Sequence, residues 1–210
     1  MVATGSRADR VVLHNISWEQ YENLLRDLGD RSGSRVAYRD GMLEIMTPLP
    51  EHEYLKEVIG DAIKDFADAY GIDYDSYGST TWRKQAKNAG AEPDNCFYFQ
   101  NEPLIRGRFD LDLTQGDPPP DLVLEIDITS KSLDRFAIYA RLGVPELWCY
   151  DAGVLKLYCL VGQGYRETDR SLVLPQLPWR ELPQIIESHR QAGRRAVRKA
   201  FREWAASCIG

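Results

Sequence analysis

Acidic and apolar residues alternate along residues 121–129, the most strongly strand-like segment of the chain. Because successive side chains of a strand point to opposite faces, one face of this segment is apolar: Leu122, Leu124, Ile126 and Ile128. The other face carries the carboxylates of Asp121, Glu125 and Asp127, with neighbours in this series ~7–13 Å apart along the strand. Aspartate is rare in strands and like charges repel, so this face indicates a bound cation. The alternative is a half-exposed strand whose polar face meets water.

Another acidic residue opens the preceding strand-like segment, residues 93–100, in the sequence Glu92-Pro93-Asp94. If the two segments are neighbours in a sheet, Asp94 lies beside Glu125. Carboxylate oxygens from adjacent strands are the hard ligands that Mg²⁺ prefers, completed by water and phosphate oxygens. Such an ion lowers the pKa of a bound water and stabilises the charge that develops at a phosphate undergoing hydrolysis. Taken alone, Asp94 is also typical of an ordinary turn before a strand.

Other kinds of catalytic centre find little support in the residues. The four cysteines lie far apart without a CxxC pair and the three histidines are scattered, which disfavours a zinc site. No P-loop, GxGxxG motif or Ser–His–Asp arrangement is recognisable.

The composition is that of an ordinary globular protein, with 43% hydrophobic and 28% charged residues among 210. This length, without an internal repeat or a linker, predicts one domain over residues 11–210 after a loose terminus at residues 1–10. No apolar run approaches the roughly 20 residues that span a bilayer, and the first ten residues lack the apolar stretch of a secretory signal. We therefore expect a cytoplasmic protein without membrane contact.

Charge is distributed unevenly along the chain. The net charge of −6 disfavours a protein that coats nucleic acid nonspecifically. Residues 190–202, however, contain six basic and no acidic side chains. At helical spacing Arg194 and Arg198 fall on one face with two more arginines. That face is either the solvated side of a docked helix, or a contact for a phosphate backbone or an acidic neighbour. In the phosphate reading, Arg194 and Arg198 bind the substrate.

Local signals predict alternating helices and strands. A capping box at Ser17 begins a helix that Gly29 ends, a hairpin turn is centred on Asp40, and Ser132 is expected to cap a later helix. The expected helices are 17–29, 51–70, 132–143 and 182–204, and the expected extended segments are 35–38, 42–46, 72–82, 93–100, 121–129, 146–150 and 154–160. This order favours a mixed α/β (α+β) fold with one central sheet.

Several short motifs follow one another in a specific order. From residue 120 the chain reads Pro-Asp-Leu-Val-Leu-Glu-Ile, followed by a polar Thr-Ser turn. The next helix ends in Tyr-Ala-Arg-Leu-Gly-Val-Pro-Glu, before Leu147-Trp148 and Tyr150-Asp151. Upstream stand Leu-Glu-Ile-Met-Thr-Pro from residue 43, Glu51-His52 and Glu92-Pro93-Asp94. From about residue 16 to residue 160, this set resembles the Uma-two family of restriction endonuclease-like proteins, in the PD-(D/E)xK nuclease superfamily.

The resemblance implies a restriction endonuclease-like core with flanking helices, to which the N-terminal helix and hairpin are added. It implies that Asp94 is the first metal-binding aspartate and Glu125 the acidic residue of the (D/E)xK element, with Mg²⁺ or Mn²⁺ as the cofactor. His52 matches a recurring family position near the start of the long helix. As a lone histidine, it is alternatively a helix-start or core residue.

The chain departs from the superfamily pattern where lysine is expected. Asp127 stands in the lysine's place two residues after Glu125, and Arg135 occupies a helix position where many Uma-two proteins have lysine. Arginine cannot act as a general base, because its pKa stays above about 12, but it can orient a phosphate. Asp127 could serve as an extra ligand or base, and Lys131 on the intervening turn is a further substrate-binding candidate. The alternative for Arg135 is a surface salt bridge near Asp134.

Two functions compete at this point. The first is a metal-dependent endonuclease that hydrolyses DNA with a metal-bound water, with these catalytic candidates: Asp94, Glu125, Asp127, Arg135 and His52. The second is a catalytically inactive nuclease-fold module that binds nucleic acid or a protein partner, which the missing lysine favours. We also expect a homodimer, in which two sites would address the two strands of DNA.

Overall fold

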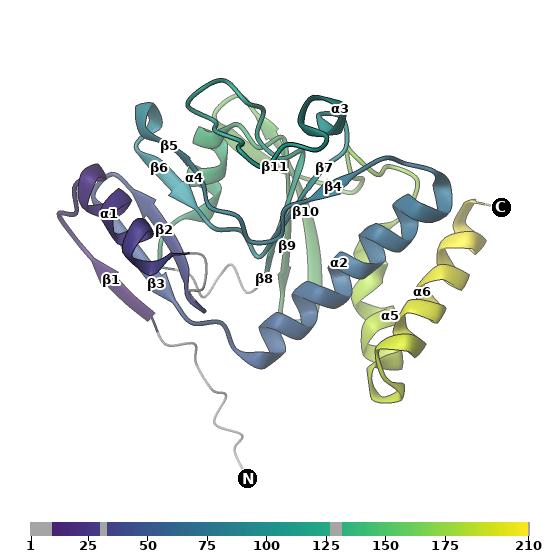
Figure 1. Cartoon of the computed structure of the whole chain (residues 1–210). Helices are drawn as coiled ribbons and strands as arrows, with labels where there is room; N and C mark the ends of the chain where they lie inside the picture. The colour runs from purple at the N-terminus through teal and green to yellow at the C-terminus, as the bar shows by residue number, and fades with distance from the viewer. Residues whose placement is uncertain (1–9, 30–32, 127–131, 210) are drawn as a thin grey trace, which may run out of the picture.

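The computed structural model describes residues 10–29, 33–126 and 132–209, whose strands form two sheets (Figure 1). The N-terminal sheet is antiparallel throughout and consists, in order, of β1 (Arg10–Leu13), β3 (Met42–Met46), β2 (Arg35–Arg39), β6 (Ala89–Ala91) and β5 (Trp82–Lys84). The larger sheet, called the central sheet below, consists of β11 (Gly164–Thr168), β10 (Val154–Val161), β9 (Glu146–Asp151), β8 (Leu122–Ile126), β7 (Asn95–Tyr98) and β4 (Asp75–Ser76). The mixed α/β class is confirmed, whereas the expectation of a single central sheet is wrong.

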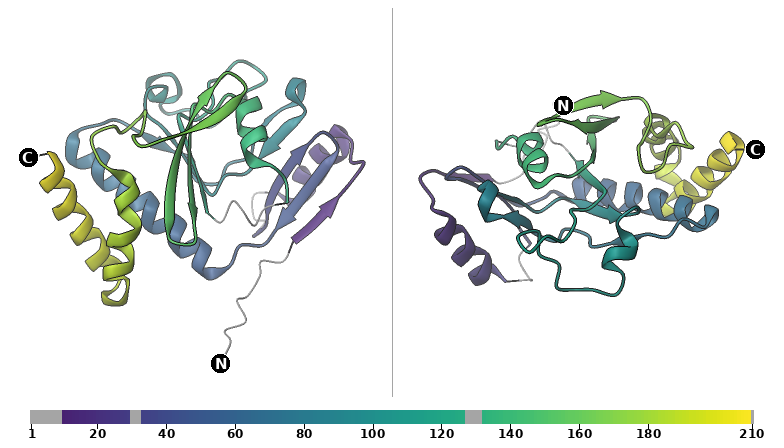
Figure 2. Two further views of the ribbon diagram at one scale, coloured as in Figure 1. Left: turned by 180° about the vertical axis from the view of Figure 1, so that it is seen from behind. Right: turned by 90° about the horizontal axis from the view of Figure 1, so that it is seen from above.

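The helices lie around these sheets at different places. The six α-helices of the described residues are α1 (Trp18–Leu28), α2 (Pro50–Tyr70), α3 (Glu102–Ile105), α4 (Arg135–Leu142), α5 (Leu182–His189) and α6 (Arg194–Ile209). Figures 1 and 2 show α1 and the N-terminal sheet at one end of the molecule and α5 and α6 at the other, with α2 between them. Strands β8 and β9 are parallel, and α4 forms the crossover between them, as parallel neighbours require.

The two sheets separate within a single stretch of chain, residues 89–98. Strand β6 pairs with β2 in the N-terminal sheet, and β7 pairs with β8 in the central sheet. Between them stand Glu92, Pro93 and Asp94. Proline has no N–H to donate to a ladder, so the strand is interrupted there and its two halves join different sheets. Asp94 consequently lies at the junction of the sheets.

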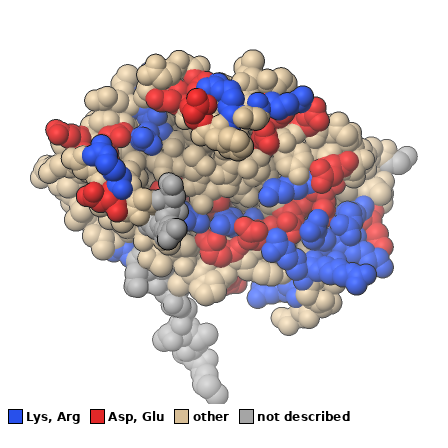
Figure 3. All heavy atoms as spheres, in the orientation of Figure 1, with Lys and Arg blue, Asp and Glu red and all other residues tan. Residues whose placement is uncertain are grey.

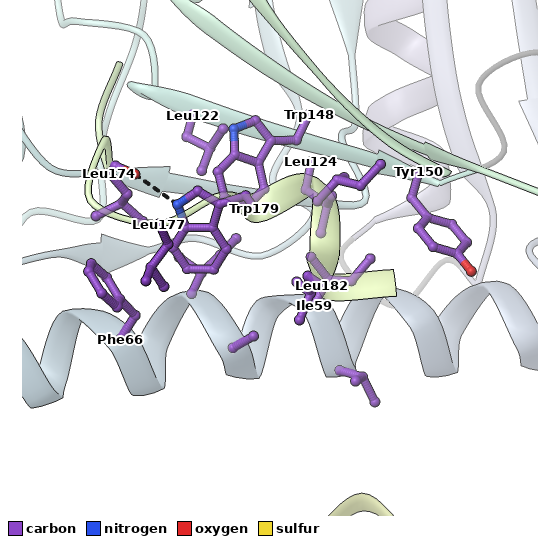
Figure 4. Close-up of a cluster of buried hydrophobic side chains, with 14 of the residues drawn as sticks. Ile59, Phe66, Leu122, Leu124, Trp148, Tyr150, Leu174, Leu177, Trp179 and Leu182 are labelled. Atoms are coloured by element: carbon purple, nitrogen blue, oxygen red, sulfur yellow. Dashed lines mark hydrogen bonds between the residues drawn. The ribbon is translucent and has the colours of Figure 1, made fainter. Parts of the chain in front are cut away.

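Both faces of the central sheet are buried at β8. Leu122, Leu124 and Ile126 pack toward α2 and the C-terminal helices, with Trp148 and Trp179 at 4.9 Å between ring centroids (Figure 4). The Trp179 indole N–H donates to the Leu174 carbonyl at 2.8 Å. Val123, on the opposite face, packs against Ile138 and Tyr139 of α4. The alternation predicted for β8 is therefore confirmed over residues 122–126, but a half-exposed polar face is wrong.

The start of α2 leads directly out of the N-terminal sheet. Pro50 stands at its first turn, where a missing N–H is tolerated, and Gly71 ends it in the left-handed conformation, with φ at 64°. The predicted helix 51–70 is thus confirmed. So is α1, where the Ser17 hydroxyl accepts the Gln20 N–H at 3.1 Å and the Gln20 amide oxygen accepts the Ser17 N–H at 2.7 Å.

Several expected boundaries differ from the structure. Helix α4 is capped by Asp134, which accepts the Ala137 N–H, and not by Ser132, whose N–H is bound elsewhere. The continuous helix expected over 182–204 is broken into α5 and α6 by Gly193, whose φ is 90°. No strand was expected over residues 83–92, but most of β5 and all of β6 lie there. None of the helices in the described ranges is long and apolar enough to cross a membrane.

Gly90 provides a test of how α1 packs on the N-terminal sheet. A Cβ there would lie 2.9 Å from the Arg83 Cβ and would collide with the Tyr21 side chain. We expect Gly90→Ala to lower the free energy of unfolding by about 1–3 kcal/mol because the core cannot accommodate the methyl group. Chemical denaturation measures this. Gly33→Ala is the matched control, since nothing lies within 4 Å of its Cβ position, and a loss as large in the control would contradict the packing.

Candidate active site

Four polar side chains from different elements are buried together where the two sheets diverge. Glu44 comes from β3, His52 from the first turn of α2, Asp94 from the β6–β7 link and Glu125 from β8. At most 4% of each is exposed. Water is therefore excluded from charged groups that ordinarily require it, and each needs a specific partner.

Asp94 is held against β8 as the sequence predicts. The β7–β8 register pairs Asn95 with Leu124, so the next position along β7 places Asp94 opposite Glu125. The Asp94 Oδ2 atom accepts the Ile126 N–H at 2.7 Å and lies 3.1 Å from His52 Nε2. Asp94 and Glu125 are thus brought together at the end of β8.

His52 joins the start of α2 to this carboxylate. Its Nδ1 atom lies 3.8 Å from the carboxylate of Glu53, which in turn pairs with Arg35 at 3.2 Å. The imidazole is buried and spans two carboxylates, so the interpretation as a residue of the site is favoured over that of an ordinary helix-start residue. Its Nε2 atom is in close contact with Asp94, although neither ring nitrogen makes a hydrogen bond with the described residues.

Glu125 is oriented from the α4 side. The Tyr139 hydroxyl donates a hydrogen bond to Glu125 Oε1. Burial, together with the charge of Glu125, raises the pKa of Tyr139 well above its usual value, so the phenol stays a neutral donor. From the sequence, Tyr139 was recognised only as the first residue of the motif Tyr-Ala-Arg-Leu-Gly-Val-Pro-Glu. Its function as a partner of Glu125 could have been inferred from its position in the helix that follows the acidic strand.

Arg135 is the cation of the site. Only 1% of this residue is exposed, and its Nη2 atom lies 2.9 Å from Glu44 Oε1, so the surface salt bridge expected near Asp134 is wrong. Burial opposes the charge of the guanidinium, but Glu125, Tyr139, Glu44 and Asp94 more than offset this and raise its pKa above the usual value. Its Nε and Nη1 atoms are buried without a hydrogen-bond partner among the described residues.

Glu44 was not predicted from the sequence as a site residue. Besides Arg135, its carboxylate accepts the N–H groups of Ser132 at 2.5 Å and Leu133 at 3.3 Å, and Arg10 Nε lies 3.6 Å away. A glutamate in an amphipathic hairpin strand carries no local signal of such a function, because its partners are almost 90 residues further along the chain.

Asp121 lies apart from the candidate site, although the sequence placed it in one acidic series with Glu125 and Asp127. Its carboxylate accepts the N–H groups of Phe99 and Asn101 at 2.7 and 2.9 Å, and the Asn101 side-chain amide at 2.6 Å. It therefore fixes the turn after β7 at the other end of β8. Asp127 and Lys131 lie outside the described residues.

The residues at the junction fit a divalent cation. Among the described residues, no group of three or more His, Cys, Asp or Glu side chains is placed to hold a metal ion. Mg²⁺, however, is usually held by one or two carboxylates, with water and substrate oxygens as its other ligands. The formal charges of Glu44, Asp94, Glu125, Arg135 and Arg10 leave one negative charge in excess. The oxygen donors of Asp94 and Glu125 therefore suit Mg²⁺ or Mn²⁺.

The basic C-terminal helix is directed toward acidic side chains of α2. Arg194 binds Asp61 at 2.6 Å, and Arg198 binds Asp65 at 2.5 Å, with Arg202 3.2 Å from the same carboxylate. Figure 3 shows this mixture of basic and acidic side chains at the end of the molecule where α6 lies. The alternative of an acidic neighbour is thus observed, and the contacts of Arg194 and Arg198 connect them with α2, not with Asp94.

The family can be assigned from the sequence as a whole. The sequence profile of Uma2, described as "Putative restriction endonuclease", matches residues 18–191. The chain belongs to the Uma2 family. Among solved structures, this Uma2 chain is similar to a crystal structure titled as a putative nuclease belonging to DUF820, from Anabaena variabilis ATCC 29413. The two share 12% sequence identity and a TM-score of 0.45, over 79% of this chain and 90% of the other. No curated protein matches the chain.

Asp121 and Asp94 are expected to respond differently to substitution. Asp121→Ala leaves buried N–H groups of the 99–101 turn without an acceptor and should lower the free energy of unfolding by about 1–3 kcal/mol. Its Mn²⁺ affinity should match that of the wild type. Asp94→Ala should abolish Mn²⁺ binding. Denaturation and calorimetric titration measure the two quantities, and loss of Mn²⁺ binding in a folded Asp121→Ala variant would contradict the separation of these carboxylates.

Tyr139→Phe removes one hydroxyl from the site. Because the buried Glu125 carboxylate then loses the hydrogen bond from this hydroxyl, we expect the free energy of unfolding to fall by about 1–3 kcal/mol. Tyr70→Phe, at an exposed tyrosine of α2, should leave it unchanged. Equal stability of the Tyr139→Phe and wild-type proteins would show that this hydrogen bond does not hold Glu125.

Proposed function

We propose that this Uma2 protein is a metal-dependent endonuclease that hydrolyses phosphodiester bonds of DNA. The observation that carries the proposal is the placement of Asp94 opposite Glu125 in the β7–β8 register, in a buried site that also contains Arg135. Membership of a family described as "Putative restriction endonuclease" supports the reaction class. The choice of DNA as substrate rests on that description, because a fold by itself does not determine a function.

In this proposal, Asp94 and Glu125 hold one Mg²⁺ or Mn²⁺ ion. When bound, the ion supplies a water of lowered pKa and stabilises negative charge on the phosphate. His52 and the Ile126 N–H fix Asp94, and Tyr139 fixes Glu125. The chain thereby holds both carboxylates in one orientation before the ion and the substrate arrive.

Arg135 is proposed to bind the phosphate. Its guanidinium stays charged and cannot accept a proton, which excludes it as the general base. Two of its nitrogens have no hydrogen-bond partner among the described residues and are able to donate to phosphate oxygens. Asp127 as base or ligand and Lys131 as a substrate contact remain part of the proposal.

Other expectations stay predictions. Arg194 and Arg198 are still partly exposed while they bind α2, so a DNA backbone could share their N–H groups. The homodimer and the cytoplasmic location stay predictions as well.

One observation favours the second candidate function, a noncatalytic module. Arg135 stands where many proteins of the Uma2 (Uma-two) family have a lysine. It is already paired with Glu44. A site of this kind could bind DNA and leave it intact.

Cleavage of a supercoiled plasmid and a labelled duplex by the purified chain tests the proposal. With Mn²⁺ we expect cutting that EDTA stops, and Asp94→Asn and Glu125→Gln should each lower the rate by about a hundredfold or more. Glu146→Gln is the matched control, because it changes an equally buried carboxylate whose partners are Trp148, Leu172 and Val173, and it should cut at nearly the wild-type rate.

Two other outcomes of the cleavage assay would count against the proposal. Undiminished cutting by both site variants would contradict the proposed site. DNA binding without cleavage, under every metal tested, would favour the noncatalytic module.

A further inference from the structure

Glu44 connects the N-terminal sheet to the centre of the candidate site. It is fully buried in β3, and its Oε1 atom binds Arg135 Nη2 at 2.9 Å. Its Oε2 atom accepts the N–H groups of Ser132 and Leu133, which immediately precede α4. A single side chain therefore anchors both the guanidinium and the chain that leads into the helix carrying it.

The charge of Arg135 acts on more than one carboxylate. Arg135 lies one helical turn before Tyr139 in α4, so both side chains are on the helix face that meets Glu125, which accepts the Tyr139 hydroxyl. Glu125 and Asp94, the proposed cation ligands, favour the charged guanidinium, as does Glu44. A permanent cation this close to the ligands opposes the arrival of a divalent one, because the two attract the same carboxylates and repel each other. The position of Arg135 thus influences how strongly the site attracts a metal ion.

We propose that Glu44 is a positioning residue that holds Arg135 toward the N-terminal sheet and so keeps Asp94 and Glu125 available to a divalent cation. This inference rests on the cation site of the proposed function. Glu44 is suited to the task because it offers the guanidinium a competing carboxylate that is itself fixed by two backbone N–H groups. Arg135 then remains near enough to bind a phosphate oxygen without neutralising the metal ligands.

The two partners of this ion pair should have opposite effects on cation binding. In calorimetric titrations with Mn²⁺, Glu44→Gln should weaken binding by about tenfold or more. Without its Glu44 partner, Arg135 then pairs with the carboxylates of Asp94 and Glu125. Arg135→Gln should strengthen binding by about tenfold or more, since the competing cation is gone. Two independent charges would also give opposite shifts, so the double variant separates positioning from charge alone.

Each single variant leaves a buried charge without its partner, and the fold could fail. Thermal unfolding identifies such a failure. The double variant Glu44→Gln/Arg135→Gln removes both charges, and its Mn²⁺ affinity should match that of Arg135→Gln, because Glu44 acts on the ligands only through Arg135. Glu146→Gln is the control, because Glu146 is equally buried but accepts the N–H groups of Leu172 and Val173 at the opposite end of β9. Its affinity should equal that of the wild type.

The outcomes separate this inference from the proposed function. Weaker binding by Glu44→Gln, stronger binding by Arg135→Gln and a double variant that binds like Arg135→Gln support the inference whether or not the protein cuts DNA. Where the single variants unfold, a double variant that binds Mn²⁺ about tenfold or more tightly than the wild type supports it. Equal shifts, no shifts, or wild-type affinity in the double variant overturn it. A wild type that binds no Mn²⁺ also overturns it, because Asp94 and Glu125 are then not available to the cation, and binding gained by Arg135→Gln would in that case still locate the cation site. Plasmid cleavage is measured separately and decides the proposed function alone.

Discussion

Buried negative charge at the junction of the two sheets constrains much of this structure. Glu44, Asp94 and Glu125 reach the junction from three separate segments and lie out of contact with water. Removing carboxylates from water is unfavourable unless each gains hydrogen bonds or an opposite charge. The partners they find determine the local architecture. Ile126 and His52 hold Asp94, Tyr139 holds Glu125, and Arg135 with two backbone N–H groups holds Glu44. The first turns of α2 and α4 are consequently fixed relative to both sheets.

The apolar packing supplies the rigidity that such a site needs. The apolar side chains of β8 pack on the α2 side, while Glu125 is on the α4 side with Tyr139. A one-residue slip of β8 would exchange these faces, so burial of the leucines also fixes the direction of Glu125. Pro93 has a comparable effect on Asp94, because it interrupts the strand just before the carboxylate is needed at the junction. Positioning of the candidate ligands therefore follows from hydrophobic register and from a break in a strand.

Much of the fold and part of the site are encoded in local patterns. The capping box at Ser17, the amphipathic period of α2 and the alternation along β8 each act over a few residues, and each was predictable. The adjacency of Asp94 and Glu125 also followed from two neighbouring strand patterns. Glu44 did not, because its function arises from partners distant in the chain. For Arg135 the sequence left a site role and a surface salt bridge both open, because charged side chains are usually exposed. The division into two sheets was missed for the same reason: strand pairing is a nonlocal property, and β5 and β6 are short and lie in polar sequence.

The most direct test of the central claim, that Asp94 and Glu125 hold a divalent cation, is anomalous diffraction from crystals of the protein grown with Mn²⁺. The expected result is one manganese peak at roughly 2.0–2.6 Å from a carboxylate oxygen of each residue, the range typical of hard cations bound by oxygen. The peak should be absent from crystals of the Asp94→Asn variant under the same conditions. A manganese peak elsewhere, or wild-type crystals without one at saturating Mn²⁺, would contradict the site.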